Sequence, residues 1–332
     1  MPTLEELRDH YVFESSPTRH DLGALHVPFD DLVGDHRTER RLDGAVRRQE
    51  RAALIGPSGC GKSSVLARVL GSDIEGVAPL IVPLAALPAT TIDTPSHLVD
   101  HLLATVIRQA GVSTADLDAD VASHTEIVTT TKRGGLAAGW GWLKGELARE
   151  VKRQTEIERH ASLIDKTDAL AKVLELITHD DLQPVLVFDD TDRWLSNGGP
   201  ALMRSFFSEG VRWLLELPAS LVVAVHPHYF TDLPQQQLLQ YIDTQITIPQ
   251  ITNPGGIEAI LARRIELYAD TDKPDLRSVF TDDAVIAVHN VYTDSGSLRR
   301  AIQICHTAVH DALDAGLQQV TKYHIQAAAN AG

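Results

Sequence analysis

Eight residues near the start of the chain have the types and the spacing needed to hold a row of phosphates. Residues 56–63 read Gly-Pro-Ser-Gly-Cys-Gly-Lys-Ser, which fits two glycines separated by four residues and followed by lysine and serine. Gly59 and Gly61 let backbone N–H groups turn inward around an anion, and a helix starting near Lys62 adds the positive end of its dipole. Lys62 can reach the β- and γ-phosphates, and the Ser63 hydroxyl can bind Mg²⁺. The predicted phosphate-binding residues are Gly56, Pro57, Ser58, Gly59, Cys60, Gly61, Lys62, Ser63 and Ser64.

A second group of residues has the chemistry to hold a metal ion and to activate water. Residues 185–188 read Val-Leu-Val-Phe, and Asp189 and Asp190 follow directly. Four apolar residues that end in two carboxylates are typical of a buried strand that delivers acids to the carboxyl edge of a sheet, where ligands bind in open α/β folds. We predict that Asp189 binds Mg²⁺ through water and that Asp190 orients and deprotonates the attacking water. The alternative is an acidic turn after a core strand.

The elements that must position these residues follow a regular alternation. Buried strands are predicted at 52–55, 79–84, 185–188, 221–225 and 241–248, and helices near 39–49, 62–70, 96–110, 143–160, 167–178 and 201–217. After Asn253-Pro254 only helices are predicted, at 256–268, 281–290, 296–313 and 321–330. Strands that alternate with helices favour a parallel sheet covered on both faces. We therefore expect an α/β P-loop core followed by a small all-helical domain.

Two further segments resemble parts of one ATPase family. Phe29–Gly34 reads Phe-Asp-Asp-Leu-Val-Gly, and 296–302 reads Gly-Ser-Leu-Arg-Arg-Ala-Ile. Together with the phosphate loop and the aspartate pair, they make the chain similar to the AAA+ ATPases, nearest to the origin-recognition, transposition-regulator and bacterial defence branches. The resemblance implies ATP and Mg²⁺ as cofactors, with Val33 and Gly34 touching adenine. It also implies that Arg299, at the start of the third lid helix, is a sensor of the γ-phosphate; the alternative is a solvated arginine at a helix start.

The sequence departs from that family pattern at two positions. Many relatives carry glutamate where this chain has Asp190, and a shorter side chain positions water less well, so we expect slow turnover. A polar residue such as asparagine is common after the fourth strand, where this chain has His226. His226 can still bond the attacking water or the γ-phosphate; otherwise it is a loop histidine at a strand end.

Family members usually complete the site with an arginine from a neighbouring subunit. Arg212 and Arg204, on the helix before the fourth strand, are candidates, and Arg193 is a third. The sequence does not choose among them, and each alone is more often a surface arginine. An arginine that acts in trans requires a homo-oligomer or a hetero-complex through ATPase interfaces, and a ring or filament is the expected geometry.

The stretch between the two motifs is longer than a minimal core of this kind requires. We predict three domains: an N-terminal extension at 1–25, a nucleotide-binding domain at 26–250 with an insertion at about 111–165, and a helical lid at 251–332. Within the insertion, Trp140 and Trp142 lie in an apolar stretch of small residues. This stretch either packs on the protein's own core, or contacts a protein partner, or stacks on nucleic acid.

Composition limits the function classes. A formal net charge of −15 lowers the expectation of autonomous DNA binding, although a local basic patch would still permit it. There is no apolar run long enough for a membrane span, no secretory signal, and only two cysteines, so we expect a cytoplasmic protein.

Three functions stay open at this point. The first is an ATPase whose hydrolysis switches or drives a partner. The chain carries no nuclease, protease or deaminase motif, so an effector activity would then sit on another chain, as in phage defence. The second is a nucleotide-gated assembly module with little turnover. The third is a DNA-associated loader or recombination ATPase; too few residues follow 315 for the winged helix that such relatives often carry.

Overall fold

The computed structural model describes residues 2–14, 19–71, 76–83, 95–109, 163–179, 182–189, 191–193, 203–231, 234–268 and 275–331. The chain divides into two compact units. One unit contains residues 1–42, 56–72 and 247–332, and the other contains residues 43–55 and 73–246. The predicted helix at 143–160 and the tryptophan segment of the insertion lie outside the described residues.

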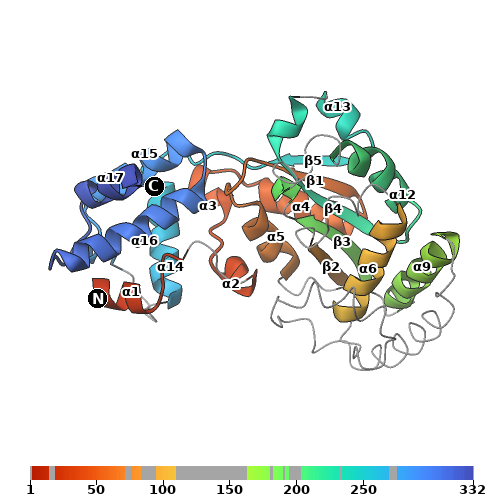
Figure 1. Cartoon of the computed structure of the whole chain (residues 1–332), viewed down its shortest axis with the longest axis horizontal. Helices are drawn as coiled ribbons and strands as arrows, with labels where there is room; N and C mark the ends of the chain where they lie inside the picture. Colours follow the sequence, from red (N-terminus) through yellow and green to blue (C-terminus); the bar gives the residue numbers. More distant parts are fainter. Residues whose placement is uncertain are drawn as a thin grey trace. The chain divides into compact units, whose positions relative to one another are not determined.

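A five-stranded sheet forms the centre of the second unit (Figure 1). Its strands are β1 (Arg51–Ile55), β2 (Val77–Pro83), β3 (Gln183–Asp189), β4 (Ser220–Val225) and β5 (Thr244–Thr247), in the order β2-β3-β4-β1-β5. The pairs β2–β3, β3–β4 and β1–β4 are parallel. Their carboxyl ends therefore share one edge, with Ile55 opposite Val225. This arrangement confirms the predicted α/β class with a parallel sheet.

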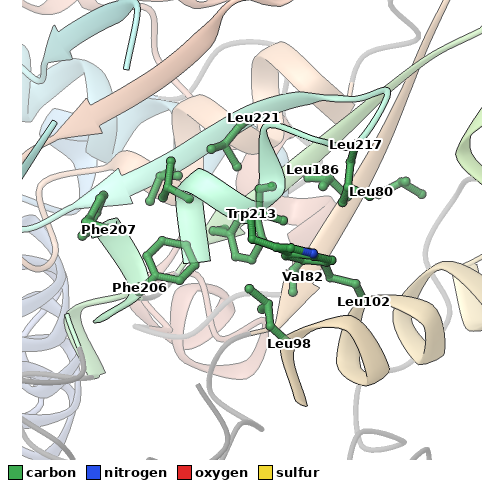
Figure 2. Packing of buried hydrophobic residues seen from close by; sticks show 14 of the residues in the cluster. Leu80, Val82, Leu98, Leu102, Leu186, Phe206, Phe207, Trp213, Leu217 and Leu221 are labelled. Carbon is green, nitrogen blue, oxygen red and sulfur yellow. The ribbon is translucent and has the colours of Figure 1, made fainter. Parts of the chain in front are cut away.

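The strands are apolar along most of their length because both faces of the sheet are covered. One face packs against α6 (Pro95–Gln109) and the helical stretch that contains α12 (Val211–Leu214). Figure 2 shows this layer at close range, with the Trp213 ring among strand and helix side chains. The labelled core residues are Leu80, Val82, Leu98, Leu102, Leu186, Phe206, Phe207, Trp213, Leu217 and Leu221. The helix α9 (Leu163–His179) packs beside α6 and contacts β3.

The helix predicted at 201–217 differs from the structure in one respect. Residues Phe206–Gly210 have π-helical geometry, and α12 continues from them to Leu214. The wider turn accommodates two adjacent buried rings, Phe206 and Phe207, whose centroids are 5.2 Å apart in an edge-to-face arrangement. Periodicity at 3.6 residues per turn does not reveal such a local change. The strand predicted at 241–248 is also shorter, because β5 begins at Thr244.

In its described residues, the first unit is mainly helical apart from the phosphate loop and a bridge between Phe280 and Val320. Its elements are α1 (Leu4–Asp9), α2 (Arg19–Ala24), α3 (Phe29–Val33), α5 (Lys62–Gly71), α14 (Pro254–Tyr268), α15 (Asp282–Ser295), α16 (Leu298–Asp314) and α17 (Lys322–Ala331). The last four match the helices predicted after residue 253. They pack against one another as a small bundle, coloured blue in Figure 1. The helix α4 (Thr38–Arg47) begins in this unit and ends in the other.

Residues before the phosphate loop are built into the helical bundle. The helix α1 lies against α16, burying Leu4 and Leu7 (Figure 1). The ring of Phe13 meets that of Phe280 edge-to-face at 5.5 Å. The buried Arg264 of α14 donates from Nη1 to the carbonyl oxygens of Val12 and Glu14, each at 3.1 Å. These contacts attach the start of the chain to the lid.

Candidate functional site

The phosphate loop has the backbone geometry that its sequence predicts. Gly59 and Gly61 have φ angles of +75° and +106°, which residues with a Cβ rarely adopt. The loop leads directly into α5, whose first residue, Lys62, is buried. Lys62 Nζ donates to the carbonyl oxygens of Gly56 at 2.7 Å and Pro57 at 3.0 Å. The ammonium group therefore lies at the loop itself, and these residues fit a triphosphate.

The predicted adenine segment lies beside the loop. Residues Phe29–Val33 form α3, and Gly34 ends it in the left-handed conformation with φ +70°. A Cβ added at Gly34 would meet no atom within 4 Å, so the requirement there is for the backbone angle alone. A Cβ added at Gly61 would lie 4.0 Å from Cζ of Phe29. The segment that carries Val33 and Gly34 thus starts next to the phosphate loop.

The start of the lid helix α16 contacts the phosphate loop on another side. The Leu298 N–H donates to the Gly59 carbonyl oxygen at 2.9 Å. A Cβ added at Gly59 would lie 2.4 Å from Ser297 Oγ and 3.2 Å from Cβ of Arg299. Ser297 also caps α16, because its Oγ accepts from the Arg300 N–H. The structure therefore brings Arg299 to the loop, and its role as a sensor stays a prediction.

A partly buried hydrogen-bond chain joins α4 to α5 through His26, and no pattern in the sequence predicts it. His26 Nε2 lies 2.8 Å from Glu39 Oε1, and His26 Nδ1 lies 3.0 Å from Ser64 Oγ. Burial raises the pKa of Glu39, but hydrogen bonds from His26 and from the Phe29 N–H outweigh burial and leave that pKa lowered. Ser64 follows the predicted Mg²⁺ ligand Ser63 in sequence. The only available signal was a histidine just before the Phe29 segment, which by itself indicates nothing.

At the carboxyl edge of the sheet in the other unit, the end of β3 is bonded to β4. Asp189 is the last residue of β3 and is buried. Two residues later, the Thr191 hydroxyl donates to the Ala224 carbonyl, and the Tyr229 hydroxyl donates to the Thr191 carbonyl. Burial, with a smaller contribution from Asp192, raises the pKa of Tyr229 and keeps it protonated as a donor. The turn after Asp189 is therefore held against the neighbouring strand.

His226 follows β4 at this same edge. Its Nδ1 accepts from the His228 N–H at 3.1 Å, capping the short helical turn Pro227–Phe230. This bond gives the ring a structural partner and fixes its orientation at the strand end. Any contact of His226 with water or phosphate remains a prediction.

The remaining predicted site residues fall into two groups. Asp190 lies outside the described residues, and so does the side chain of Arg193. Arg204 and Arg212 are exposed on the helical stretch before β4, so a neighbouring subunit can reach them. Within the described ranges, no three His, Cys, Asp or Glu side chains gather as a metal site. The assignment of Ser63 and Asp189 to Mg²⁺ rests on the sequence motifs.

Comparison with known proteins addresses the family directly. A model of the AAA ATPase domain matches residues 37–223, more than half of the chain and including both the phosphate loop and Asp189. The chain belongs to the AAA ATPase family. No curated protein matches it in sequence. Within the described residues, no helix of this AAA ATPase has the length and apolar character needed to cross a membrane.

Solved structures show the same fold at low sequence identity. Orc1 of Aeropyrum pernix, in complex with DNA, is 18% identical with a TM-score of 0.51, covering 92% of this chain and 68% of its own. Cdc6p of Pyrobaculum aerophilum is 17% identical with a TM-score of 0.52, covering 93% and 67%. The ADP form of the Aeropyrum pernix ORC2 protein is 14% identical with a TM-score of 0.51, covering 96% and 72%. The predicted likeness to the origin-recognition branch of the AAA+ ATPases is confirmed for the fold.

Proposed function

We propose that this AAA ATPase binds and hydrolyses ATP and uses the state of the nucleotide to switch or remodel a protein partner. The observation that carries the proposal is the hydrogen bond from the Leu298 N–H to the Gly59 carbonyl. It joins the lid to the loop that would hold the phosphates. A change in the phosphates can therefore move α16 without any intermediate element.

The residues divide the chemistry among themselves. The loop amides and Lys62 bind the phosphates, and the Val33–Gly34 backbone holds the base. Mg²⁺, held by Ser63 and Asp189, would supply charge neutralisation. Asp190 orients and accepts a proton from the attacking water, and His226 assists in placing that water. Arg299 sits one residue beyond the bonded Leu298 and bonds the terminal phosphate, so its release follows hydrolysis.

The proposal that a separate partner takes part rests on two points. The sequence shows no nuclease, protease or deaminase motif, and related ATPases work in multi-protein systems, which is an analogy at the level of the fold. The proposed partner carries the effector activity, in a multi-subunit system such as phage defence in the cytoplasm. Arg204, Arg212 or Arg193 completes the site of a neighbouring copy. Exposure of Arg204 and Arg212 supports this part of the proposal.

Turnover and particle mass test the proposal together. We expect wild type to hydrolyse ATP, Lys62→Ala to lose tight ATP binding, and Asp190→Asn to keep binding but lose most turnover. Arg299→Ala should keep the fold and impair hydrolysis. Unchanged turnover in Asp190→Asn rejects its role as the base, and unchanged ATP affinity in Lys62→Ala rejects the phosphate site. The exposed Arg40→Ala on α4 is the matched control for loss of a positive charge.

A nucleotide-gated assembly module is the second candidate, favoured by the short side chain at Asp190. It predicts that ATP increases particle mass in light scattering while turnover stays near background. Binding to DNA is tested alongside, because the Aeropyrum pernix Orc1 of similar fold was solved in complex with DNA. Fluorescence anisotropy with a labelled duplex at two salt concentrations measures it. Binding that weakens with salt supports the DNA arm.

A further inference from the structure

We propose that His26 is a positioning residue that couples the adenine segment to the phosphate-binding helix, so that it sets base discrimination in the proposed nucleotide site. The inference rests on the proposed function. It concerns His26 and Glu39, which no sequence motif marks. His26 would touch neither base nor phosphate, and would act through Glu39 and Ser64.

The geometry places His26 between two functional segments. On one side, Glu39 Oε1 accepts from His26 at 2.8 Å and from the Phe29 N–H at 2.9 Å, and so holds the first residue of α3. On the other side, Ser64 lies in the first turn of α5 and contacts His26 Nδ1 at 3.0 Å. The His26 ring is buried and its centroid is 6.1 Å from that of Phe29. One imidazole thus connects the start of α3 with the start of α5.

Counting hydrogens shows that the ring bridges in either protonation state. Ser64 Oγ has one hydrogen and lies within bonding distance of two groups, the Leu22 carbonyl at 3.2 Å and His26 Nδ1. In the protonated ring both nitrogens carry a hydrogen, so Ser64 accepts from Nδ1 and donates its own hydrogen to Leu22. In the neutral ring that carries its hydrogen on Nε2, Ser64 donates to Nδ1. Glu39 accepts from Nε2 in both arrangements, so the link persists.

The other end of α3 is held independently by the lid. Asn253 Nδ2 donates to the Leu32 carbonyl at 3.5 Å, and a Cβ added at Gly256 would lie 3.1 Å from that oxygen. The close approach at Gly256 leaves α3 little room to shift toward α14. The link through His26 therefore decides whether the Val33–Gly34 backbone stays at a fixed distance from the phosphate loop. A base bound there would be read only if that distance is fixed.

The experiment separates base recognition from phosphate binding. Calorimetry with Mg²⁺ would measure Kd for ATP, GTP and inorganic tripolyphosphate in wild type, His26→Ala, His26→Gln and Glu39→Gln. We expect His26→Ala to weaken ATP about tenfold and to reduce the preference for ATP over GTP, with tripolyphosphate changed less than about twofold. His26→Gln keeps a donor and an acceptor and should recover most of the preference. His10→Ala, on an exposed histidine, is the control.

The other results overturn the inference. Equal loss of ATP and tripolyphosphate would mean that His26 only supports the loop, and unchanged ATP affinity in His26→Ala would mean that it positions nothing. The double variant of His26→Ala and Glu39→Gln tests whether the two residues act through one hydrogen-bond chain. Effects on ATP affinity that simply add in that variant would contradict such a chain, because linked residues are non-additive. Failure of wild type to bind ATP rejects the proposed function instead. Urea unfolding of each variant identifies one that has merely lost its fold.

Discussion

The glycine at position 59 meets two requirements at once. Its φ of +75° lets the loop turn, and its missing side chain lets Ser297 and Arg299 approach. The same residue accepts the lid's hydrogen bond from Leu298. Backbone conformation, close packing and the contact with the lid are therefore combined at one position.

Gly59→Ala tests this combination. The added methyl group would meet Ser297 Oγ at 2.4 Å in a backbone region that alanine disfavours. We expect the unfolding free energy to fall by about 1–2 kcal/mol and ATP turnover to fall further than ATP affinity. Urea unfolding and steady-state kinetics measure the two effects. Gly71→Ala is the control, because a Cβ at Gly71 meets nothing within 4 Å. Turnover equal to wild type would contradict the role of the lid contact.

Glu39 gives the site a pH-dependent contribution to stability. Its folded-state pKa is lowered by His26 and Phe29 although burial raises it. A lowered pKa contributes stability above the unfolded pKa, and that contribution is lost as pH falls through the folded pKa. The difference in unfolding free energy between wild type and Glu39→Gln should therefore shrink as pH falls from about 5 to about 3. Urea titrations across this range measure it, with Glu175→Gln, on the exposed face of α9, as the control. A difference that stays constant with pH would contradict the assignment.

At the scale of elements, the N-terminal residues and the lid behave as one packed group. The helix α1 lies on α16, and α2 lies on α5. Two arginines of α14 also bond this part of the chain. Arg263 donates to the carbonyl of Ala24, the last residue of α2, at 2.9 Å, and Arg264 donates to the carbonyls of Val12 and Glu14, which lie between α1 and α2. The start of the chain thus contacts both the lid and the phosphate-binding helix.

Arg264→Met tests the attachment of the N-terminal residues. Methionine fills the volume but donates nothing, which leaves the Val12 and Glu14 carbonyls without this donor. Burial already lowers the pKa of Arg264, which is consistent with an interior guanidinium. We expect a loss of about 2–3 kcal/mol in unfolding free energy and faster proteolysis before residue 19. Arg40→Met, on an exposed helix face, is the control. Wild-type resistance to protease would show that the attachment does not depend on this arginine.

Sequence reasoning predicted the elements whose signals are local. The loop at Gly56–Ser63, the apolar run before Asp189 and the four lid helices carry their own patterns. By contrast, the packing of α1 on α16 depends on a partner hundreds of residues away. The bonds of His26 likewise join positions 13 and 38 residues apart. Neither spacing follows a helical or strand period, so only the folded chain shows them.

At the scale of the whole molecule, we propose that an arginine from a second copy completes the ATPase site. Arg204 and Arg212 are exposed, so either side chain could reach the ATPase site of a neighbouring subunit. A site of this kind is complete only in an assembly. Its activity should then depend on protein concentration.

Mixing two inactive variants tests whether an arginine acts in trans. Lys62→Ala keeps the arginine but loses its own phosphate site, and Arg212→Ala keeps the site but loses the arginine. If Arg212 acts in trans, a mixture in equal amounts should recover about a quarter of wild-type turnover, through mixed neighbours. The same mixture with Arg204→Ala compares the two candidates. No recovery in either mixture, with both single variants inactive, would place the arginine in cis.

The order in which the chain is made has a consequence for when it can act. Residues 73–246 are synthesised before any residue from 247 onward, and they include β2, β3 and β4, of which β4 pairs with β1. The unit that contains the phosphate loop needs residues from 247 onward, since Leu298 bonds Gly59 across 239 positions. A ribosome that has passed residue 246 thus carries strands β1 to β4 and a phosphate loop that still lacks its lid. The proposed response to nucleotide would therefore be acquired late in translation, after the strands that support it.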